Sequence, residues 1–293
     1  QNHTIYRLCY IRAPKKIMQS PRILVAQSTP LARNSSALCS TLSRFSTSTV
    51  AKEASLKKIV VFGGNGYVGQ HVCEAATSIY GCEVVSISRS GGPKTPEKAS
   101  WMEKVDWAKG DIFDGSTYEK HFDGAVGAIS CVGAFGSNEF MEKINGDSNI
   151  NAVLEAKKAG VKSFTFVSTV DSNLPHFVLK GYFNGKRRAE KQVLESFPET
   201  GVVLRPSFVY GTRYQGSFGI PLWVLGQPLE KVFSTQPFPQ LANSVPGMKA
   251  ILAPPIPVDV VGLNAVAGAL GKLSPGIKSV TDMVMFYNQE IKN

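Results

Sequence analysis

The chain has 293 residues, of which 43% are hydrophobic and 18% charged, a balance typical of a globular protein with a sizeable core. Its net charge is +10, but residues 1–50 hold seven Lys or Arg and no acid, so that +3 is left for the remainder. This distribution argues against a nucleic-acid-binding surface on the folded part, and no run approaches the roughly 18 consecutive apolar residues of a membrane-spanning helix.

Residues 1–50 have the composition of a mitochondrial presequence, because they combine Arg with many Ser and Thr and lack acids. Arg22, Arg33 and Arg44 are eleven residues apart, close to three helical turns, and would share one face of an amphipathic helix. Met18 is a candidate start of translation that keeps this pattern. We therefore expect a disordered or removed presequence, and a protein of the mitochondrial matrix that is soluble or peripheral to the inner membrane. A disordered basic tail is the alternative.

From Lys57 onward, short β-branched runs alternate with longer stretches of helical periodicity. Strands are predicted at Lys58–Phe62, Glu83–Ser88, Val105–Ala108, Ala125–Cys131, Ser163–Ser168 and Val202–Arg205. Helices are predicted at Tyr67–Ile79, Tyr118–Phe122, Glu139–Ala159, Val178–Phe197 and Val258–Lys272. This alternation is typical of a parallel sheet with helices on both faces. The sequence thus predicts an α/β fold, a Rossmann-type doubly wound parallel sheet, in a single domain over residues 55–293.

The first predicted strand leads directly into a glycine-rich run, in which three glycines have the GxxGxxG spacing. A bound dinucleotide needs a tight turn, a close backbone approach and a helix N-terminus facing its pyrophosphate. The spacing alone is weak, but here it lies between a strand and a helix at the start of the series. A structural glycine turn is the alternative. The predicted pyrophosphate-binding residues are Gly63, Asn65, Gly66, Tyr67, Val68 and Gly69.

A site that prefers NAD(H) places Asp or Glu at the end of the second strand, where it binds the ribose 2′-hydroxyl. This chain has Ser88 and Arg89 there instead. Since a guanidinium pairs with phosphate in a bidentate way, these residues favour NADP(H) over NAD(H). A solvated loop Arg is the alternative. Asp111, after the third strand, is a candidate acceptor for the adenine amino group or a plain turn residue.

Tyr182 and Lys186 form a YxxxK pair in the helix predicted after the fifth strand. The i,i+4 spacing puts both side chains on one helix face, where an ammonium stabilises tyrosinate and makes the phenol a proton donor or acceptor. Ser168, at the end of the preceding strand, is predicted to orient a substrate carbonyl. The three residues form a candidate catalytic set. The alternative is a structural remnant on a binding protein.

Residues 212–257 follow the alternating series and contain aromatic residues, such as Phe218, Trp223 and Phe233, with few charges. In parallel sheets, ligands bind beyond the carboxyl ends of the strands. We therefore expect this segment to be a substrate-side or lipid-facing wall. A second small core is the alternative. The five cysteines and four histidines have no metal-ligand spacing, so free thiols and no metal site are expected.

These motifs, with RPSFVYG at 205–211 and PVDV at 257–260, resemble the extended and atypical short-chain dehydrogenase/reductase superfamily. SISRSG (86–91), KINGDSNINA (143–152) and GYFNGKRRAE (181–190) further resemble a mitochondrial subgroup. It comprises a reductase-like protein associated with coenzyme Q (ubiquinone) biosynthesis and, more distantly, the nucleotide-binding accessory subunit of respiratory complex I.

The resemblance implies roles for residues that spacing alone does not single out. Asn145 matches the family's helix Asn. The family's usual NNAG after the fourth strand is replaced in this chain by Ser130, Cys131, Val132 and Gly133. The further cofactor-binding residues implied are Cys131, Val132 and Gly133 in that loop, and Pro206, Ser207 and Phe208 along the nicotinamide.

Two classes of function follow. The first is an NADP(H)-dependent oxidoreductase acting on an apolar, quinone-type substrate in ubiquinone biosynthesis. The second is a non-catalytic nucleotide-binding subunit that stabilises a complex at the mitochondrial inner membrane, such as complex I. The YxxxK pair favours the first class, and the resemblance to accessory proteins favours the second.

Overall fold

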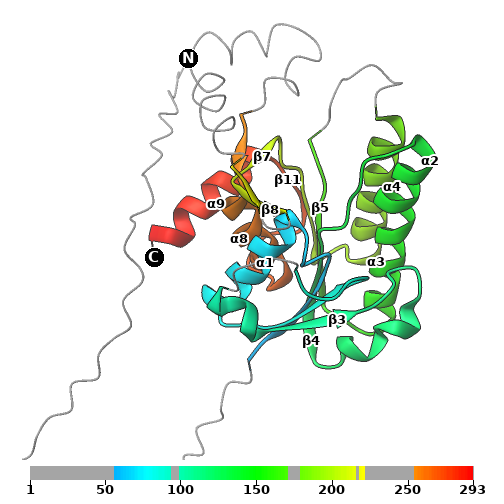
Figure 1. Ribbon diagram of the computed structural model, residues 1–293, viewed down its shortest axis with the longest axis horizontal. Helices are drawn as coiled ribbons and strands as arrows, with labels where there is room; N and C mark the ends of the chain where they lie inside the picture. Colours follow the sequence, from blue (N-terminus) through cyan, green and yellow to red (C-terminus); the bar gives the residue numbers. More distant parts are fainter. Residues whose placement is uncertain (1–55, 94–98, 171–178, 216–217, 222–253, 293) are drawn as a thin grey trace, which may run out of the picture. The chain divides into compact units, whose positions relative to one another are not determined.

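The computed structural model describes residues 56–93, 99–170, 179–215, 218–221 and 254–292 (Figure 1). The chain divides into two units, Gln1–Lys52 and Glu53–Asn293, and every described residue belongs to the second. The predicted presequence and most of the aromatic segment, including Trp223, therefore lie outside the described residues.

A seven-stranded sheet forms the centre of the second unit, with the strand order β11-β6-β5-β4-β1-β2-β3 and parallel pairing throughout. The strands are β1 (Lys58–Phe62), β2 (Glu83–Ser88), β3 (Val105–Lys109), β4 (Ala125–Ser130), β5 (Ser163–Val167), β6 (Gly201–Leu204) and β11 (Gly276–Lys278). The order reverses between β1 and β4, which is where ligands bind in doubly wound sheets. The predicted fold class is confirmed.

Helices cover both faces of the sheet (Figure 1). On one face lie α1 (Tyr67–Ser78), α8 (Val258–Ala269) and α9 (Val280–Lys292). On the other lie α2 (Asn138–Glu142), the π-helical turn η4 (Lys143–Asp147), α3 (Ser148–Lys158) and α4 (Lys180–Ser196). Three short 3₁₀ helices are η1 (Ser100–Lys104), η2 (Gly115–Thr117) and η3 (Glu119–Phe122).

The alternation of side chains along β1 explains why both faces are covered. Ile59 and Val61 pack into the core under α1 and α8, whereas Val60 and Phe62 pack into the core under α3 and α4. A strand with apolar residues at every position is stable only when both faces are buried. Packing against these two cores holds the carboxyl ends of the strands in place.

Two small sheets extend that edge. Strand β7 (Val209–Tyr210) pairs in parallel with β10 (Ile256–Pro257). Strands β8 (Thr212–Gln215) and β9 (Phe218–Pro221) pair antiparallel. The β7–β10 pairing connects the residues after β6 with the start of α8.

The helix predicted at Glu139–Ala159 is instead interrupted by the π-helical turn. Gly146 and Gly185 face each other there, and a Cβ on Gly185 would lie 2.8 Å from the Gly146 nitrogen. The Asn145 amide donates to the Met141 and Ala134 oxygens at 2.8 Å each. A π-helical turn contains one residue more than a turn of α-helix. The close approach of α4 and the hydrogen bonds of the inward-pointing Asn145 amide explain why it forms here.

Candidate functional site

The glycine-rich loop connects β1 to α1 as a tight turn. Gly63 has a φ of 75°, a conformation that favours glycine, and its nitrogen donates to the Ile87 oxygen of β2 at 2.9 Å. The Gly66 nitrogen donates back to the Gly63 oxygen at 3.0 Å, and Gly66 is the N-cap of α1. The first turn of α1 contains no acid. Its N-terminal N–H groups and dipole therefore suit a pyrophosphate.

Two further glycines let the loop approach its neighbours. A Cβ on Gly69 would lie 2.1 Å from the Gly63 oxygen, so that any side chain there would push the loop away from the helix. A Cβ on Gly64 would lie 2.3 Å from the Ser86 hydroxyl oxygen. The loop thus fits a dinucleotide, because its backbone is held in place and no side chain projects from Gly63, Gly66 or Gly69.

The turn after β2 lies against the glycine-rich loop. The Asn65 amide donates to the Ser90 hydroxyl at 2.8 Å, and the Ser88 hydroxyl donates to the Gly91 oxygen at 2.6 Å. Arg89 is exposed between these two anchored serines. An exposed guanidinium on a fixed turn beside the adenosine end of the loop has the chemistry to bind a 2′-phosphate.

Asp111 follows β3 and is exposed. Its carboxylate accepts from the Phe113 nitrogen at 3.1 Å, and its own nitrogen donates to the Thr117 hydroxyl at 3.0 Å. These bonds shape the turn into η2. The adenine contact of Asp111 stays a prediction.

The loop after β4 is tied to α4 and to the helix-breaking turn. Lys186 donates to the Val132 oxygen at 3.1 Å, and the Asn145 oxygen accepts from the Ala134 nitrogen at 3.2 Å. A Cβ on Gly133 would lie 3.0 Å from that Asn145 oxygen and 3.4 Å from the Lys186 nitrogen. Burial raises the pKa of the Cys131 thiol to about 12, so that it is a neutral thiol at neutral pH. The predicted loop and the predicted lysine are therefore neighbours.

Lys186 is almost fully buried, with 4% of its surface exposed. Its ammonium also donates to the Val167 oxygen at 2.9 Å and lies 4.5 Å from the centre of the Phe166 ring. Burial lowers the pKa of Lys186 to about 8. The lysine is thus held at the carboxyl ends of β4 and β5 and remains protonated at neutral pH.

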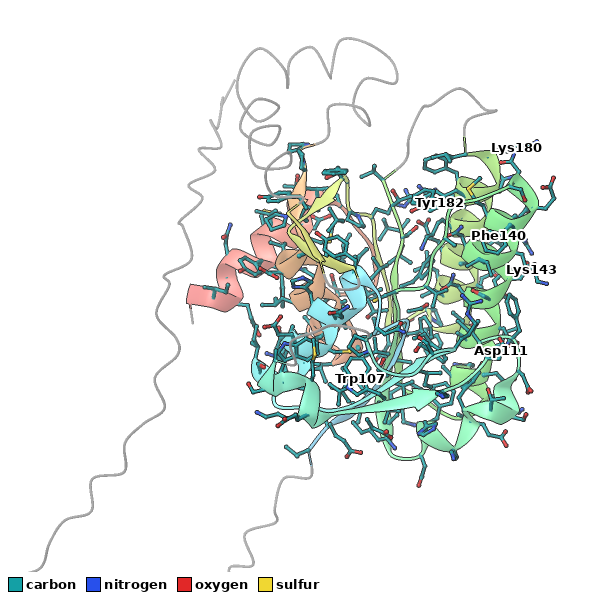
Figure 2. All side chains as sticks on the ribbon, in the orientation of Figure 1. Trp107, Asp111, Phe140, Lys143, Lys180 and Tyr182 are labelled. Atoms are coloured by element: carbon teal, nitrogen blue, oxygen red, sulfur yellow. The ribbon has the colours of Figure 1, made fainter. Side chains whose placement is uncertain are left out.

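Tyr182 lies one turn before Lys186 near the start of α4 (Figure 2). The Lys186 nitrogen is 6.0 Å from the centre of its ring. The ring stacks on Phe135 with a centroid distance of 4.9 Å and an interplanar angle of 14°. Burial raises the pKa of Tyr182, and a hydrogen bond with the Thr169 side chain and the charge of Arg187 oppose the rise. The phenol is therefore protonated at neutral pH and in contact with Thr169.

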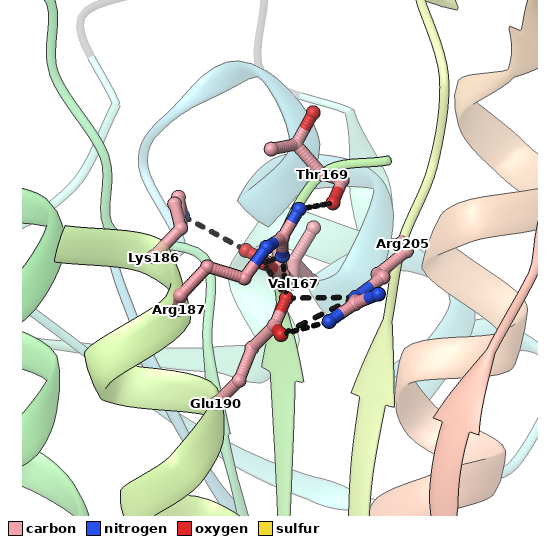
Figure 3. A network of polar contacts seen from close by, with 7 residues as sticks. Val167, Thr169, Lys186, Arg187, Glu190 and Arg205 are labelled. Atoms are coloured by element: carbon pink, nitrogen blue, oxygen red, sulfur yellow. Dashed lines mark hydrogen bonds and ion pairs between the residues drawn. The ribbon is translucent and has the colours of Figure 1, made fainter. Parts of the chain in front are cut away.

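A polar network of Arg187, Glu190 and Arg205 lies at the ends of β5 and β6 (Figure 3), and it includes Ser168. Its hydroxyl donates to the buried Glu190 carboxylate and accepts from Arg187 at 3.3 Å. Glu190 also pairs with Arg187, and with Arg205 at 2.6 Å. Arg187 donates to the Thr169 oxygen at 2.9 Å. This network ties α4 to the ends of β5 and β6.

Hydrogen bonds hold the residues after β6 in place. The Pro206 oxygen accepts from the Val170 nitrogen at 3.0 Å, and the Ser207 hydroxyl donates to the Pro254 oxygen. The Phe208 oxygen accepts from the Ile256 nitrogen at 2.9 Å, while its side chain is half exposed. This segment lies next to the end of β5, and its contact with a nicotinamide stays a prediction.

Phe135, Thr169 and Glu190 are absent from the set predicted by sequence reasoning. Phe135 stacks on Tyr182 and is 69% exposed. Thr169 follows Ser168 directly, after the end of β5. The sequence therefore indicates a hydroxyl side chain after this strand, without showing which of the two residues provides it. No pattern in the sequence singles out Phe135 or Glu190.

Comparison with known proteins agrees with this geometry. The NAD(P)H-binding family matches residues 63–216, which is more than half of the chain. The chain belongs to the NAD(P)H-binding family. Its match begins at the first glycine of the loop and extends through β8, so it includes the loop, Tyr182, Lys186 and the residues after β6.

Several relatives are similar in sequence, three of which follow. The chain is 42% identical over 219 residues to the chloroplastic protein At1g32220 of Arabidopsis thaliana, covering 74% of this chain and 73% of that one. It is 30% identical to MIOREX complex component 2 of Saccharomyces cerevisiae, over 53% of this chain and 73% of the relative. It is 29% identical to the mitochondrial protein FMP52-1 of Scheffersomyces stipitis, over 58% and 80%.

Among solved structures, the enzyme WbmH of Bordetella bronchiseptica in complex with NAD+ has a TM-score of 0.52 at 15% identity, covering 81% of this chain and 83% of that one. This likeness supports the fold. Within the part of the chain that the structure describes, none of the helices has the length and apolar character needed to cross a bilayer.

Proposed function

We propose that this protein is a mitochondrial NADP(H)-dependent reductase of an apolar, quinone-type substrate, with a role in ubiquinone biosynthesis. The observation that carries the proposal is the placement of Tyr182 and the buried Lys186 beside the loops after β4 and β5. Those loops are at the carboxyl edge of the sheet, where the glycine-rich loop also lies.

Each residue has a distinct part in the proposal. The Gly63–Gly69 backbone binds the pyrophosphate, and Arg89 binds the 2′-phosphate. Lys186 holds the ribose hydroxyls and contributes positive charge. Tyr182 is the proton donor, because its phenol is neutral at neutral pH. NADPH, when bound, supplies a hydride.

We assign the orienting hydroxyl to Thr169 rather than to Ser168. Thr169 lies close enough to Tyr182 to lower the pKa of its phenol, whereas the Ser168 hydroxyl is used by Glu190 and Arg187. In this proposal a substrate carbonyl that accepts from Tyr182 also accepts from Thr169. This geometry supports polarisation of the carbonyl by two hydroxyls.

The stack of Phe135 on Tyr182 supports a planar, apolar substrate. The Phe135 ring is 69% exposed beside Tyr182, so an apolar substrate that reaches the Tyr182 hydroxyl has an aromatic side chain to contact. The motifs that resemble the coenzyme Q-associated subgroup point to the same class of substrate.

The test is NADPH oxidation by the purified protein in the presence of short-chain quinones. Tyr182→Phe should lower kcat by about a hundredfold or more, because the variant lacks the proton donor. NADPH binding should be unchanged in a calorimetric titration. Full turnover by this variant would contradict the catalytic assignment.

The relative that is named as a component of the MIOREX complex favours a second proposal, in which the protein is a nucleotide-binding subunit of a mitochondrial assembly. In that case NADPH binds, Tyr182→Phe has no effect on any activity, and the protein sediments with a larger complex from mitochondrial extracts. The relative named as mitochondrial and the acid-free segment support a location in the matrix.

A further inference from the structure

The turn after β2 contains two serines, and the hydroxyl of the first is used within the turn. Ser88 is half-buried, and its hydroxyl donates to the Gly91 oxygen at 2.6 Å. Its backbone oxygen accepts from the Gly91 nitrogen at 3.3 Å and from the Gly110 nitrogen at 3.1 Å. Because a serine hydroxyl has a single proton, Ser88 has none left for a ligand. Ser88 therefore shapes the turn.

The second serine, Ser90, is exposed and uses its hydroxyl in the opposite way. Its oxygen accepts from the Asn65 amide nitrogen at 2.8 Å. Its own proton is donated to no acceptor among the residues that the structure describes. A hydroxyl whose oxygen is held by one bond and whose proton is free is a donor that a ligand can use.

Asn65 connects Ser90 to the glycine-rich loop. Asn65 lies in that loop between β1 and α1, and its backbone oxygen accepts from the Gln70 side chain at 3.1 Å. Gln70 is buried on α1. The Asn65 backbone is thus held from α1, while its side chain reaches the turn after β2. This bond joins the two segments that bind the pyrophosphate and the adenosine ribose of a dinucleotide in this fold.

Arg89 lies between the two serines, is exposed and has no acidic partner in the part of the chain that the structure describes. The end of the second strand is where the ribose 2′-oxygen of a bound dinucleotide lies. A phosphate on that oxygen presents three acceptor oxygens, so one guanidinium leaves room for a second donor. Ser90 is the neighbouring hydroxyl with a proton to give.

We propose that Ser90 is a specificity-determining residue that donates to the 2′-phosphate of NADP(H), and that Asn65 positions it. The inference rests on the NADP(H) binding of the proposed function and adds a second donor beside Arg89. The bond from Ser90 to an ionised phosphate is charge-assisted, whereas the 2′-hydroxyl of NAD(H) is a neutral and weaker partner. Asn65 acts on the phosphate only through Ser90.

The first experiment titrates the full chain and its Ser90→Ala variant with NADPH and with NADH in a calorimeter. The variant should bind NADPH about tenfold more weakly and NADH within about twofold of the unaltered protein, because only the phosphate loses a donor. Ser90→Thr keeps the hydroxyl and should bind both nucleotides like the unaltered protein. The matched control is Ser196→Ala, since Ser196 accepts from the Gln192 amide at 2.9 Å in the same way at the end of α4. It should change neither affinity.

The second experiment tests the positioning role with Asn65→Ala. This variant should lower the ratio of NADPH affinity to NADH affinity severalfold, and the ratio cancels any effect on the pyrophosphate contacts, which both nucleotides share. In the Ser90→Ala background, Asn65→Ala should lower the ratio no further, because the two residues act as one unit. NADH binding shows that each variant is folded. Additive losses would mean that Asn65 acts on the phosphate without Ser90, contrary to the proposal.

The outcomes separate this inference from the proposed function. Tighter binding of NADH than of NADPH by the unaltered protein would refute the NADP(H) assignment and the Ser90 contact together. A preference for NADPH that Ser90→Ala leaves unchanged overturns the inference alone. Equal losses of NADPH and NADH affinity in Ser90→Ala overturn it as well, since the serine would then only support the turn.

Discussion

Arg89 occupies the position where a carboxylate would repel a 2′-phosphate, and the turn that holds it contains no acid. Its neighbours, Ser88 and Ser90, are fixed by hydrogen bonds, so that the guanidinium projects from an ordered turn. We therefore expect the preference for NADP(H) over NAD(H) to depend on this side chain.

Arg89→Ala should narrow the preference for NADPH over NADH by roughly 1–3 kcal/mol, the worth of a charge-assisted contact. Calorimetric titration with both nucleotides checks this. Arg188→Ala is the control, because Arg188 pairs with Glu142 and Asp147 on the helical face and should leave the preference unchanged. Tighter NADH binding by the unaltered protein would refute the assignment.

The two neighbouring hydroxyls after β5 give a second prediction at this scale. Thr169→Ala should lower kcat about a hundredfold, because it removes a donor to the substrate carbonyl. Ser168→Ala should lower the free energy of unfolding by roughly 1–3 kcal/mol, because Glu190 and Arg187 lose a buried partner, while kcat changes little. Steady-state kinetics and urea unfolding of both variants distinguish the roles. The reverse pattern would restore Ser168 as the orienting residue.

Sequence reasoning placed the candidate site at the carboxyl ends of the strands but could not choose between these hydroxyls. Ser168 and Thr169 both follow β5, and their different partners become clear only once α4 is packed against the end of that strand. Phe135 could not be found at all, since its stack on Tyr182 arises from a loop and a helix more than forty residues apart.

At the scale of elements, the six predicted strands each begin and end within one residue of the observed strands. Continuous apolar runs bounded by glycine and polar residues are strong signals for buried parallel strands. Strand β11 and helix α9 were not predicted. The strand has only three residues between Pro275 and Ser279, and its pairing with β6 depends on contacts that are distant in sequence.

Helix α4 carries a buried lysine, and this has a consequence for stability. Burial lowers the pKa of Lys186 to about 8, from 10.5 in the unfolded chain. Between these pH values the unfolded state holds more protons, so the contribution of Lys186 to the free energy of unfolding rises with pH. Below pH 8 the buried charge costs the folded state up to roughly 3 kcal/mol.

Urea unfolding of the protein and of Lys186→Met from pH 7 to 10.5 tests this effect. The unfolding free energy of the wild type minus that of the variant should increase by up to roughly 3 kcal/mol across the interval. Using the difference cancels the titration of the cysteines. Lys191→Met, at an exposed position on the same helix, should give no such increase. A pH-independent difference for Lys186→Met would show that the lysine is solvated.

At the scale of the whole molecule, targeting and folding are predicted to be independent. The second unit begins at Glu53, and the basic, acid-free segment lies before it in the sequence. Deleting residues 1–50 should leave a folded protein that isolated mitochondria do not import, whereas the full chain is imported. Protease protection measures import, and NADPH binding measures folding. Import of the truncated chain would show that the targeting signal lies in the second unit.

The position of α8 and α9 has a consequence for how the protein is made. Both helices complete the core that α1 begins, and α8 is buried almost along its whole length. A chain that leaves a ribosome or an import channel amino end first exposes the apolar side of α1 and β1 until these last helices follow. We therefore expect the protein to depend on a holding chaperone until its carboxyl end has emerged.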